Sequence, residues 1–337
     1  MSIADQITRL QNAKAAIKTA ITNKGVVVSD TAKLDEYPAL INSINVSSGS
    51  GGSSGGDSGS SGSEYEHPDF FSIRTTNGTD YSYLFYYARE HQAPANINNW
   101  DISKVTNLSY TFAYSNITFL DLSNWDTSNV KNMTRTFASC YVPSLDLSKW
   151  NTNNVENMDA MFYSYSRLTS LNVSGWNTSK VKDMNNIFYN CSGLTSLDLS
   201  GWNTSKVTSA TAMFYNCSKL VDIYGELDFS NLTGGIFIAS YSNPFYKCNA
   251  LETVYMKNIY KDITIKNDAK YGINLGETKV KDECLLYIIN ELPDLVNDKG
   301  LTATDKIVLT LPKTNTLTAE QVAVAVNKGW QVANTTY

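Results

Sequence analysis

The chain has 337 residues, 42% of them hydrophobic and 18% charged, which is the composition of a globular protein with room for more than one domain. Its formal net charge is −5, so the basic surface that nucleic-acid binding requires is not expected. No apolar run is long enough to span a bilayer, and we expect no membrane insertion. The first residues lack the basic start and apolar core of a secretory signal peptide.

Residues 1–46 are predicted to form a small α-helical module. Its apolar residues follow alternating spacings of four and three, with Lys14 as a polar break, which is the seam of a heptad pattern: Ile3, Ile7, Leu10, Ile17 and Ile21. So short a segment buries little surface alone, so we expect it to form a homo-oligomer or to attach to a larger body. The alternative is a two-helix mini-domain that packs only on itself. Residues 47–63 contain only Ser, Gly and one Asp, which predicts a flexible linker.

A repeat of 25 or 26 residues follows the linker. It is marked by tryptophans: Trp100, Trp125, Trp150, Trp176 and Trp202. Each Trp is followed by Val after five residues and by Phe after twelve, and Leu precedes each Trp from the second on. Repeats of this length form solenoids, so we predict leucine-rich repeats over 100–256. Residues 64–99 are predicted to be an N-terminal cap with a degenerate repeat, in which Tyr87 takes the place of Phe112.

Each repeat combines two periods. Val181, Met184 and Phe188 are spaced three and four apart, which predicts a short helix of about two turns. Leu197 and Leu199 alternate with polar residues, which predicts a strand with these leucines inside. The predicted fold class is therefore an α/β leucine-rich-repeat solenoid, with parallel strands on one side and short helices on the other.

Residues 257–337 lose the repeat and are predicted to form an α/β C-terminal cap. The expected elements are helices over 283–297 and 318–328 and strands over 306–311 and 330–333. Thr318 and Gln321 have the spacing of a capping box at a helix start. Gly329 stands where a glycine commonly ends a helix.

The repeat resembles the BspA-like leucine-rich repeats, which also occur in mycoplasma surface lipoproteins. The resemblance is carried by Leu-Asp-Leu-Ser-Asn-Trp-Asp-Thr-Ser-Asn-Val at 120–130 and Met-Phe-Tyr-Asn-Cys-Ser at 213–218, and it covers roughly 80–256. It implies surface display and adhesion or ligand binding rather than catalysis. Those bacterial proteins carry export signals, and none is expected here.

The N-terminal module resembles the segment that opens many tail, fibre and other virion proteins of phages infecting Gram-positive bacteria. Residues 3–14 and 20–26 carry the resemblance, followed by Leu-Asp-Glu-Tyr-Pro at 34–38, and residues 317–330 resemble the ending of such proteins. The resemblance implies a virion structural protein that is assembled in the host cytoplasm, attached to a capsid or tail protein through 1–46 and displayed on the particle.

We therefore expect a tail-fibre, head-fibre or decoration protein whose solenoid is an adhesin for a host-surface glycan or protein. Two alternatives remain open. One is a bacterial cell-surface adhesin, and the other is a capsid decoration that binds no ligand.

The predicted ligand-binding site is a column of residues that point outward from successive strands: Asp121, Asp146, Asn172, Asp198, Tyr224 and Tyr255. Carboxylates can hydrogen-bond sugar hydroxyls and tyrosines can stack on sugar rings, so this column suits a glycan or a protein. The acids are also suitable calcium ligands. The alternative is that polar residues only keep an exposed sheet soluble.

Further columns lie beside the repeated Phe. Tyr163, Tyr189, Tyr215 and Tyr246 follow it directly, and they either mark a binding surface or pack between turns with their hydroxyls in water. The tyrosine-rich run 81–87 is either a cap or an exposed aromatic rim. The cysteines come three residues after the Phe and are expected to be free buried thiols, with a disulfide between two of them as the alternative: Cys140, Cys191, Cys217 and Cys248. The tryptophans are expected to be structural.

Motifs for catalysis are absent from the sequence. His67 and His91 have no motif partner, and there is no phosphate-binding loop, nucleophile elbow or C-x-x-C pair. We expect no enzyme, no cofactor and no metal site. A pair of carboxylates acting as a glycosidase is the remaining catalytic alternative.

Overall fold

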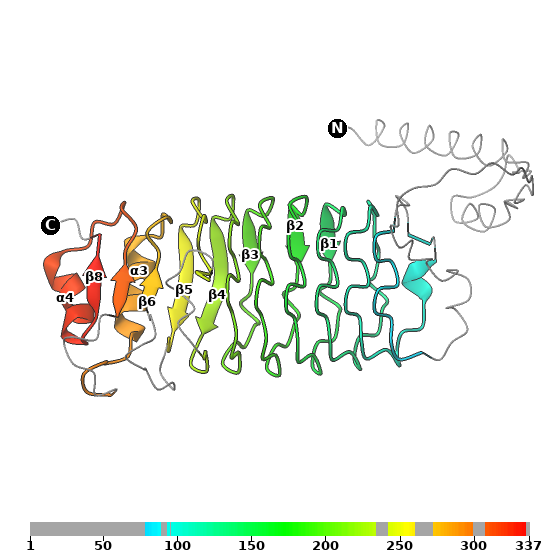
Figure 1. The fold of residues 1–337 in the computed structure, drawn as a ribbon, viewed down its shortest axis with the longest axis horizontal. Helices are drawn as coiled ribbons and strands as arrows, with labels where there is room; N and C mark the ends of the chain where they lie inside the picture. Colours follow the sequence, from blue (N-terminus) through cyan, green and yellow to red (C-terminus); the bar gives the residue numbers. More distant parts are fainter. Residues whose placement is uncertain are drawn as a thin grey trace, which may run out of the picture. The chain divides into compact units, whose positions relative to one another are not determined.

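The computed structural model describes residues 78–88, 93–94, 96–233, 242–259, 272–298 and 307–334. The chain divides into two compact units, 1–65 and 66–337, and every described residue lies in the second. The predicted helical module 1–46 and the linker 47–63 therefore lie outside the described residues. Within the second unit, successive turns of the chain stack along one axis as a parallel β-solenoid (Figure 1).

The strands of the repeated turns are short and parallel, as predicted. They are β1 (Ser144–Asp146), β2 (Ser170–Asn172), β3 (Ser196–Asp198), β4 (Asp222–Asp228) and β5 (Thr253–Lys257), preceded by the 3-10 helix η3 (Ile97–Asn99). β1 pairs with β2, and β4 lies between β3 and β5. In β3, Leu197 is buried whereas Ser196 and Asp198 are exposed, which is the alternation that the sequence predicts.

The chain opposite the strands is not helical, so the predicted short helices of the repeats are wrong. Over 184–191 the backbone N–H groups alternate between two kinds of acceptor. The N–H of Phe188 donates to the carbonyl of Met213 in the next turn, whereas that of Tyr189 donates three residues back to Asn186, both at 2.9 Å. An α-helix would bond every N–H four residues back. Overlapping turns also bring residues three and four apart to one face, so their spacing imitates a helix.

This alternation places two residues per turn in the left-handed region of backbone dihedral angles, where φ is positive. In the turn of Phe162 they are Ala160 and Ser164, each with φ of 53°. A non-glycine residue in this region is disfavoured by about 1–2 kcal/mol. Hydrogen bonds to the next turn hold both residues, because Ala160 N–H donates to Asn185 at 2.7 Å and Ser164 N–H donates to Tyr189 at 2.6 Å.

The repeated aromatic residues stack in two columns inside the solenoid. Phe rings in consecutive turns, from Phe85 to Phe245, lie 5.1–5.8 Å apart. The indoles of Trp150 and Trp176 are nearly parallel at 6.4 Å. Each Trp from Trp125 to Trp202 donates its indole N–H to a carbonyl of the preceding turn. These four tryptophans are therefore core residues, as predicted, whereas Trp100 in the first turn is partly buried against the core.

The first turn is a degenerate repeat, but its register differs from the prediction. Phe85, not Tyr87, stacks on Phe112, with the ring centroids 5.1 Å apart. Tyr87 is instead about half exposed. Ile97 keeps its predicted core position, and its carbonyl accepts the indole N–H of Trp125. The turn therefore has extra residues between Tyr87 and Ile97.

The C-terminal segment forms a second set of parallel strands with helices between them. It consists of β6 (Gly272–Asn274), α3 (Asp282–Glu291), β7 (Val308–Thr310), α4 (Ala319–Asn327) and β8 (Gln331–Ala333), with the strands in the order β6-β7-β8. The sequence predicts all of these except β6. The first helix ends earlier than predicted, because Pro293 cannot continue it. The capping box of Thr318 and Gln321 is present, and Gly329 has φ of 88° at the helix end.

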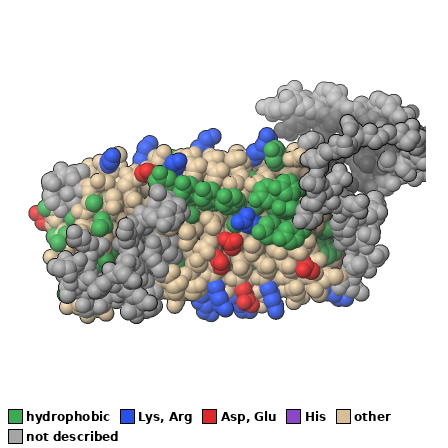
Figure 2. All heavy atoms as spheres, in the orientation of Figure 1, with side chains coloured by type: hydrophobic (Ala, Val, Ile, Leu, Met, Phe, Trp, Pro, Cys, Tyr) green, Lys and Arg blue, Asp and Glu red, His purple; other side chains and the backbone are tan. Residues whose placement is uncertain are grey.

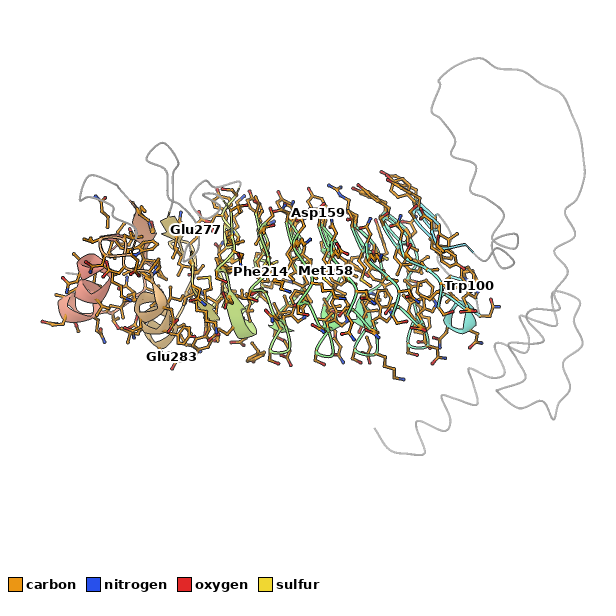
Figure 3. The ribbon with its side chains drawn as sticks, turned by 90° about the horizontal axis from the view of Figure 1, so that it is seen from below. Trp100, Met158, Asp159, Phe214, Glu277 and Glu283 are labelled. Carbon is orange, nitrogen blue, oxygen red and sulfur yellow. The ribbon has the colours of Figure 1, made fainter. Side chains whose placement is uncertain are left out.

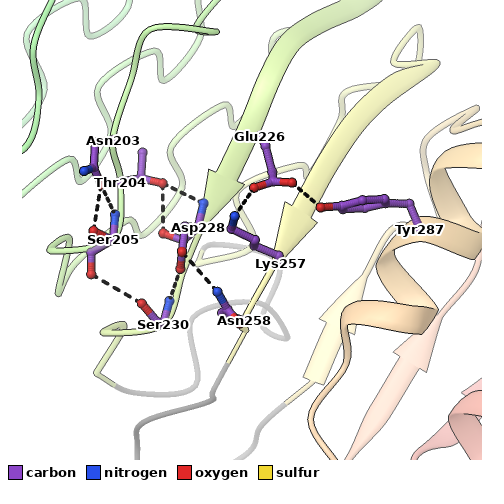
Figure 4. A network of polar contacts seen from close by, with 9 residues as sticks. All are labelled: Asn203, Thr204, Ser205, Glu226, Asp228, Ser230, Lys257, Asn258 and Tyr287. Carbon is purple, nitrogen blue, oxygen red and sulfur yellow. Dashed lines mark hydrogen bonds and ion pairs between the residues drawn. The ribbon is translucent and has the colours of Figure 1, made fainter.

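A polar cluster joins this segment to the repeated turns (Figure 4). Glu226 on β4 pairs with Lys257 on β5 and accepts a hydrogen bond from the hydroxyl of Tyr287 on α3. The ring of Tyr287 also meets that of Tyr255 edge to face, at 5.3 Å. These contacts hold α3 against the last long strands of the repeat.

Candidate functional site

The predicted ligand column lies on the strand side of the solenoid, where the sequence places it. Asp121, Asp146, Asn172 and Asp198 are exposed, Tyr224 is about half exposed, and Tyr255 is partly buried against the core. Tyr255 also packs against Tyr287, so it is less available to a ligand than predicted.

The polar residues of this column have a structural task. Asp198 accepts hydrogen bonds from both the N–H and the hydroxyl of Ser200, at 3.0 and 2.6 Å. Asp146 accepts the N–H of Ser148 at 3.1 Å. These hydrogen bonds hold the pKa of each carboxyl below its usual value. One oxygen of each side chain therefore closes the turn that follows the strand.

The predicted cysteine column is buried, and its thiols are free. Among the described residues, no group of three or more His, Cys, Asp or Glu side chains is arranged to hold a metal ion. In the same part of the chain, no helix has both the length and the apolar character needed to cross a membrane.

A more continuous surface lies on the side opposite the strands, next to the Phe column. We call it the tyrosine stripe, and it consists of Tyr83, Tyr86, Tyr87, Tyr110, Tyr114, Arg135, Tyr163, Tyr189, Tyr215 and Tyr246. Figure 2 shows a band of hydrophobic side chains, a class that includes Tyr, along one face, with a basic side chain beside it. A turn that points its Phe inward points the next residue outward, which places the tyrosines that follow a Phe. The remaining members of the stripe stand two residues before or after a Phe.

The C-terminal half of the stripe is a stack of rings. Tyr163 and Tyr189 lie 4.8 Å apart, Tyr189 and Tyr215 4.6 Å, and Tyr215 and Tyr246 5.1 Å. The first two pairs are within 14° of parallel, and the last is tilted by 37°. Because each inner ring lies between two others, its faces are covered. What such a ring offers to a ligand is its edge and its hydroxyl.

The N-terminal half of the stripe is a cluster of five rings. Tyr83 stacks on Tyr110 at 4.7 Å, and Tyr87 stacks on Tyr114 at 4.9 Å. Tyr86 lies between these pairs with its ring nearly perpendicular to all four, 4.5–5.9 Å away. Burial, together with the neighbouring phenol of Tyr87, raises the pKa of Tyr86 to about 12.

Arg135 connects the two halves. Its guanidinium carbon lies 5.7 Å from the ring centre of Tyr110 and 5.3 Å from that of Tyr163, which is cation–π distance on both sides. Asp159, labelled at the surface in Figure 3 while its neighbour Met158 points inward, lies near this guanidinium. Burial and then the charge of Asp183 raise the pKa of Asp159, and Arg135 opposes them.

The sequence identifies only part of this surface. The sequence predicts the four tyrosines from Tyr163 on as one column, and packing between turns is one of the two arrangements it allows. Arg135 is missed because it stands two residues before its Phe, in a different column from Tyr163. The signal for it is that Tyr110 occupies the same column one turn earlier.

The profile of one known family matches the repeated part of the chain. It is the family described as "Mycoplasma protein of unknown function, DUF285", and it matches residues 64–170 and 143–254. The two matches overlap and together cover 64–254, more than half of the chain. No curated protein and no solved structure matches the chain.

Proposed function

Because the chain belongs to the Mycoplasma DUF285 family, whose function is unknown, we propose its function from the surface of its solenoid. The protein is a surface-displayed binding protein, and the tyrosine stripe is its ligand-contacting face. In keeping with the resemblance of residues 1–46, we assign it to a phage virion. There it attaches to a capsid or tail protein and binds the host surface.

The observation that carries this proposal is the continuity of the stripe. Tyr and Arg are the residue types that concentrate at the energetic centres of binding interfaces. Arg135 lies between Tyr110 and Tyr163, so a cation and aromatic rings meet near the middle of the stripe. Stacking also fixes the rings before any ligand arrives, so little side-chain freedom is lost on binding.

The residues beside the stripe support the same function. Ser164, Asn190 and Asn216 each follow a tyrosine of the stacked half. Rigid tyrosines combined with small, adaptable hydrogen-bonding side chains are the composition of antibody binding surfaces. The strand-side column is a weaker candidate, because Asp146 and Asp198 already use an oxygen to close turns.

The composition of the predicted linker suits a displayed binding protein. Residues 47–63 are rich in Gly and Ser, and such sequences allow an attached body to search for its ligand. When several copies are held on one particle, weak individual contacts add up through a high effective concentration.

The test is binding of the fluorescently labelled full-length chain to a panel of Gram-positive bacteria. We expect the double variant Tyr189→Ala and Tyr215→Ala to lose at least about tenfold in affinity, as for a binding hot spot. The matched control is Tyr224→Ala, an exposed tyrosine on the strand side, and it should bind as the parent does. If only the control variant loses affinity, the binding site lies on the strand column instead. If the chain binds no strain at all, a decoration that binds no ligand is favoured. Antibody labelling of particles and of cells separates a virion from a bacterial-surface location.

A further inference from the structure

We infer that the tyrosine stripe binds an extended, uncharged polysaccharide whose chain runs parallel to the solenoid axis. This inference rests on the proposed function and names the ligand class for the same surface.

The first argument is the repetition of the surface. From Tyr163 to Tyr246 the stripe offers one phenol per turn, at steps of 4.8, 4.6 and 5.1 Å. A surface that presents the same group at every step matches a ligand that also repeats at that step. A sugar residue in an extended polysaccharide advances the chain by a similar length, whereas a globular protein rarely presents the same chemical group at every step of that length. Solenoids commonly use their extended surfaces for binding.

The second argument is the chemistry that the stacking leaves available. The faces of Tyr189 are covered by Tyr163 and Tyr215, so a sugar cannot stack on them. The hydroxyls of Tyr189 and Tyr215 interact with each other, but a phenol hydroxyl can both donate and accept, so the pair keeps hydrogen-bonding positions for a ligand. Beside the rings, the amide of Asn216 donates to that of Asn190 at 2.7 Å, which extends a row of neutral donors and acceptors along the same direction. A ligand rich in hydroxyl groups suits such a row.

The third argument is the charge along the stripe. Arg135 is flanked by two aromatic rings and lies near Asp159. Lys247, at the far end, lies over the ring of Tyr246, and its backbone N–H donates to the carboxylate of Glu277 at 2.9 Å. Acidic side chains therefore accompany the basic ones, so an anionic polymer gains no general attraction to the stripe.

The experiment uses the full-length chain and whole Gram-positive cells. Cells are treated either with a protease or with periodate, which cleaves the vicinal diols of sugars. We expect binding to survive the protease and to be lost after periodate. Soluble uncharged cell-wall polysaccharide should compete better than teichoic acid, which is anionic. Its fragments should compete about three- to tenfold better for each added repeating unit, the factor that one net hydrogen bond supplies, until the stripe is filled.

Hydroxyl-deletion variants test the geometry. Tyr189→Phe and Tyr215→Phe keep the stacked rings and remove only the hydroxyls, so each should weaken binding by about three- to tenfold without changing the melting temperature. The control is Tyr224→Phe on the strand side, which should bind as the parent does.

Three results would each overturn the inference. The first is that the protease abolishes binding and periodate spares it. The second is stronger competition by teichoic acid than by the uncharged polysaccharide, and the third is unchanged affinity in both Tyr→Phe variants of the stripe. In those cases the chain still binds cells, and the proposed function stands with another ligand. If the chain binds no cells at all, the proposed function itself fails.

Discussion

The thiol of Cys191 donates a hydrogen bond to the carbonyl oxygen of Phe162, 3.0 Å away in the preceding turn. Cys217 and Cys248 make the same bond, at the same distance, to the corresponding Phe of the turn before each. The cysteines thus provide an inter-turn hydrogen bond inside the core. Burial raises the pKa of Cys248 to about 12.

We therefore expect the native thiols to resist alkylation. Burial raises the pKa of Cys191, Cys217 and Cys248, so their reactive thiolates are scarce at pH 8. Iodoacetamide at pH 8, followed by mass spectrometry, should leave these cysteines unmodified in the folded chain and label them in urea. Labelling of the native chain as fast as the urea-unfolded control would contradict the buried column.

The left-handed residues give a second prediction. Replacing Ser164 by Gly should stabilise the protein by about 0.5–1 kcal/mol, because relief of the left-handed strain exceeds the greater freedom of unfolded Gly. Ser164→Val should destabilise it by at least about 1 kcal/mol, since a β-branched residue is poorly tolerated there. Urea unfolding measures both. The matched control is Ser196→Gly on β3, which should be destabilising.

The Phe column gives a third prediction. Phe162 is fully buried between the rings of Phe137 and Phe188, at 5.8 and 5.6 Å. Phe162→Ala should reduce the free energy of unfolding by about 3–5 kcal/mol through lost burial and a cavity. Phe119, which is 72% exposed, offers the same substitution at the surface. Phe119→Ala should change stability by less than about 0.5 kcal/mol, and equal effects of the two would disprove the stacked core.

Asp159 gives a prediction about pH. Burial and then Asp183 raise the pKa of Asp159, so the folded state holds its proton more tightly than the unfolded state. A raised folded pKa contributes stability below the unfolded value, and that contribution is lost as the pH rises through the folded value. Asp159→Asn should therefore stabilise the protein at pH 7 by up to about 1 kcal/mol and have no such effect at pH 3.

The control for this prediction is Asp198→Asn. Hydrogen bonds from Ser200 lower the pKa of Asp198, so its carboxylate is favoured in the folded state. This variant should gain no stability at pH 7. Thermal unfolding at the two pH values measures both variants, and a gain for Asp159→Asn that is independent of pH would show that its charge is not responsible.

The sequence predicts which residues are inside more reliably than it predicts the backbone that puts them there. Trp176 and Phe188 recur in phase with their counterparts, and a residue that recurs in phase must face the same way in every turn. An α-helix and a series of overlapping turns both bring residues three and four apart to one face. The spacing of Met184 and Phe188 therefore does not distinguish a helix from such turns. The distinction lies in hydrogen bonds to a turn 25 residues away.

The candidate site was predictable to a similar degree. Tyr189 and Tyr215 fall in one column by counting residues, but the stacking of their rings depends on the separation of turns, which the inter-turn backbone bonds set. Arg135 belongs to the stripe only because it lies between Tyr110 and Tyr163 in space. Around strand β6 only Ile273 and Leu275 alternate with a polar residue, which is too little pattern to indicate a strand.

The direction of the inter-turn bonds determines how the solenoid responds to force. Phe112 N–H donates to Thr136 and Phe137 N–H to Met161, and bonds of this kind run along the stacking axis at every turn. Tension applied to the two ends of the stack is carried by successive turns in series. An end turn has a neighbour on one side only, so the weaker end turn unfolds first. Each turn of 25 residues then releases about 80 Å of chain. A pulled molecule lengthens stepwise, so the turns that remain folded keep their surface intact.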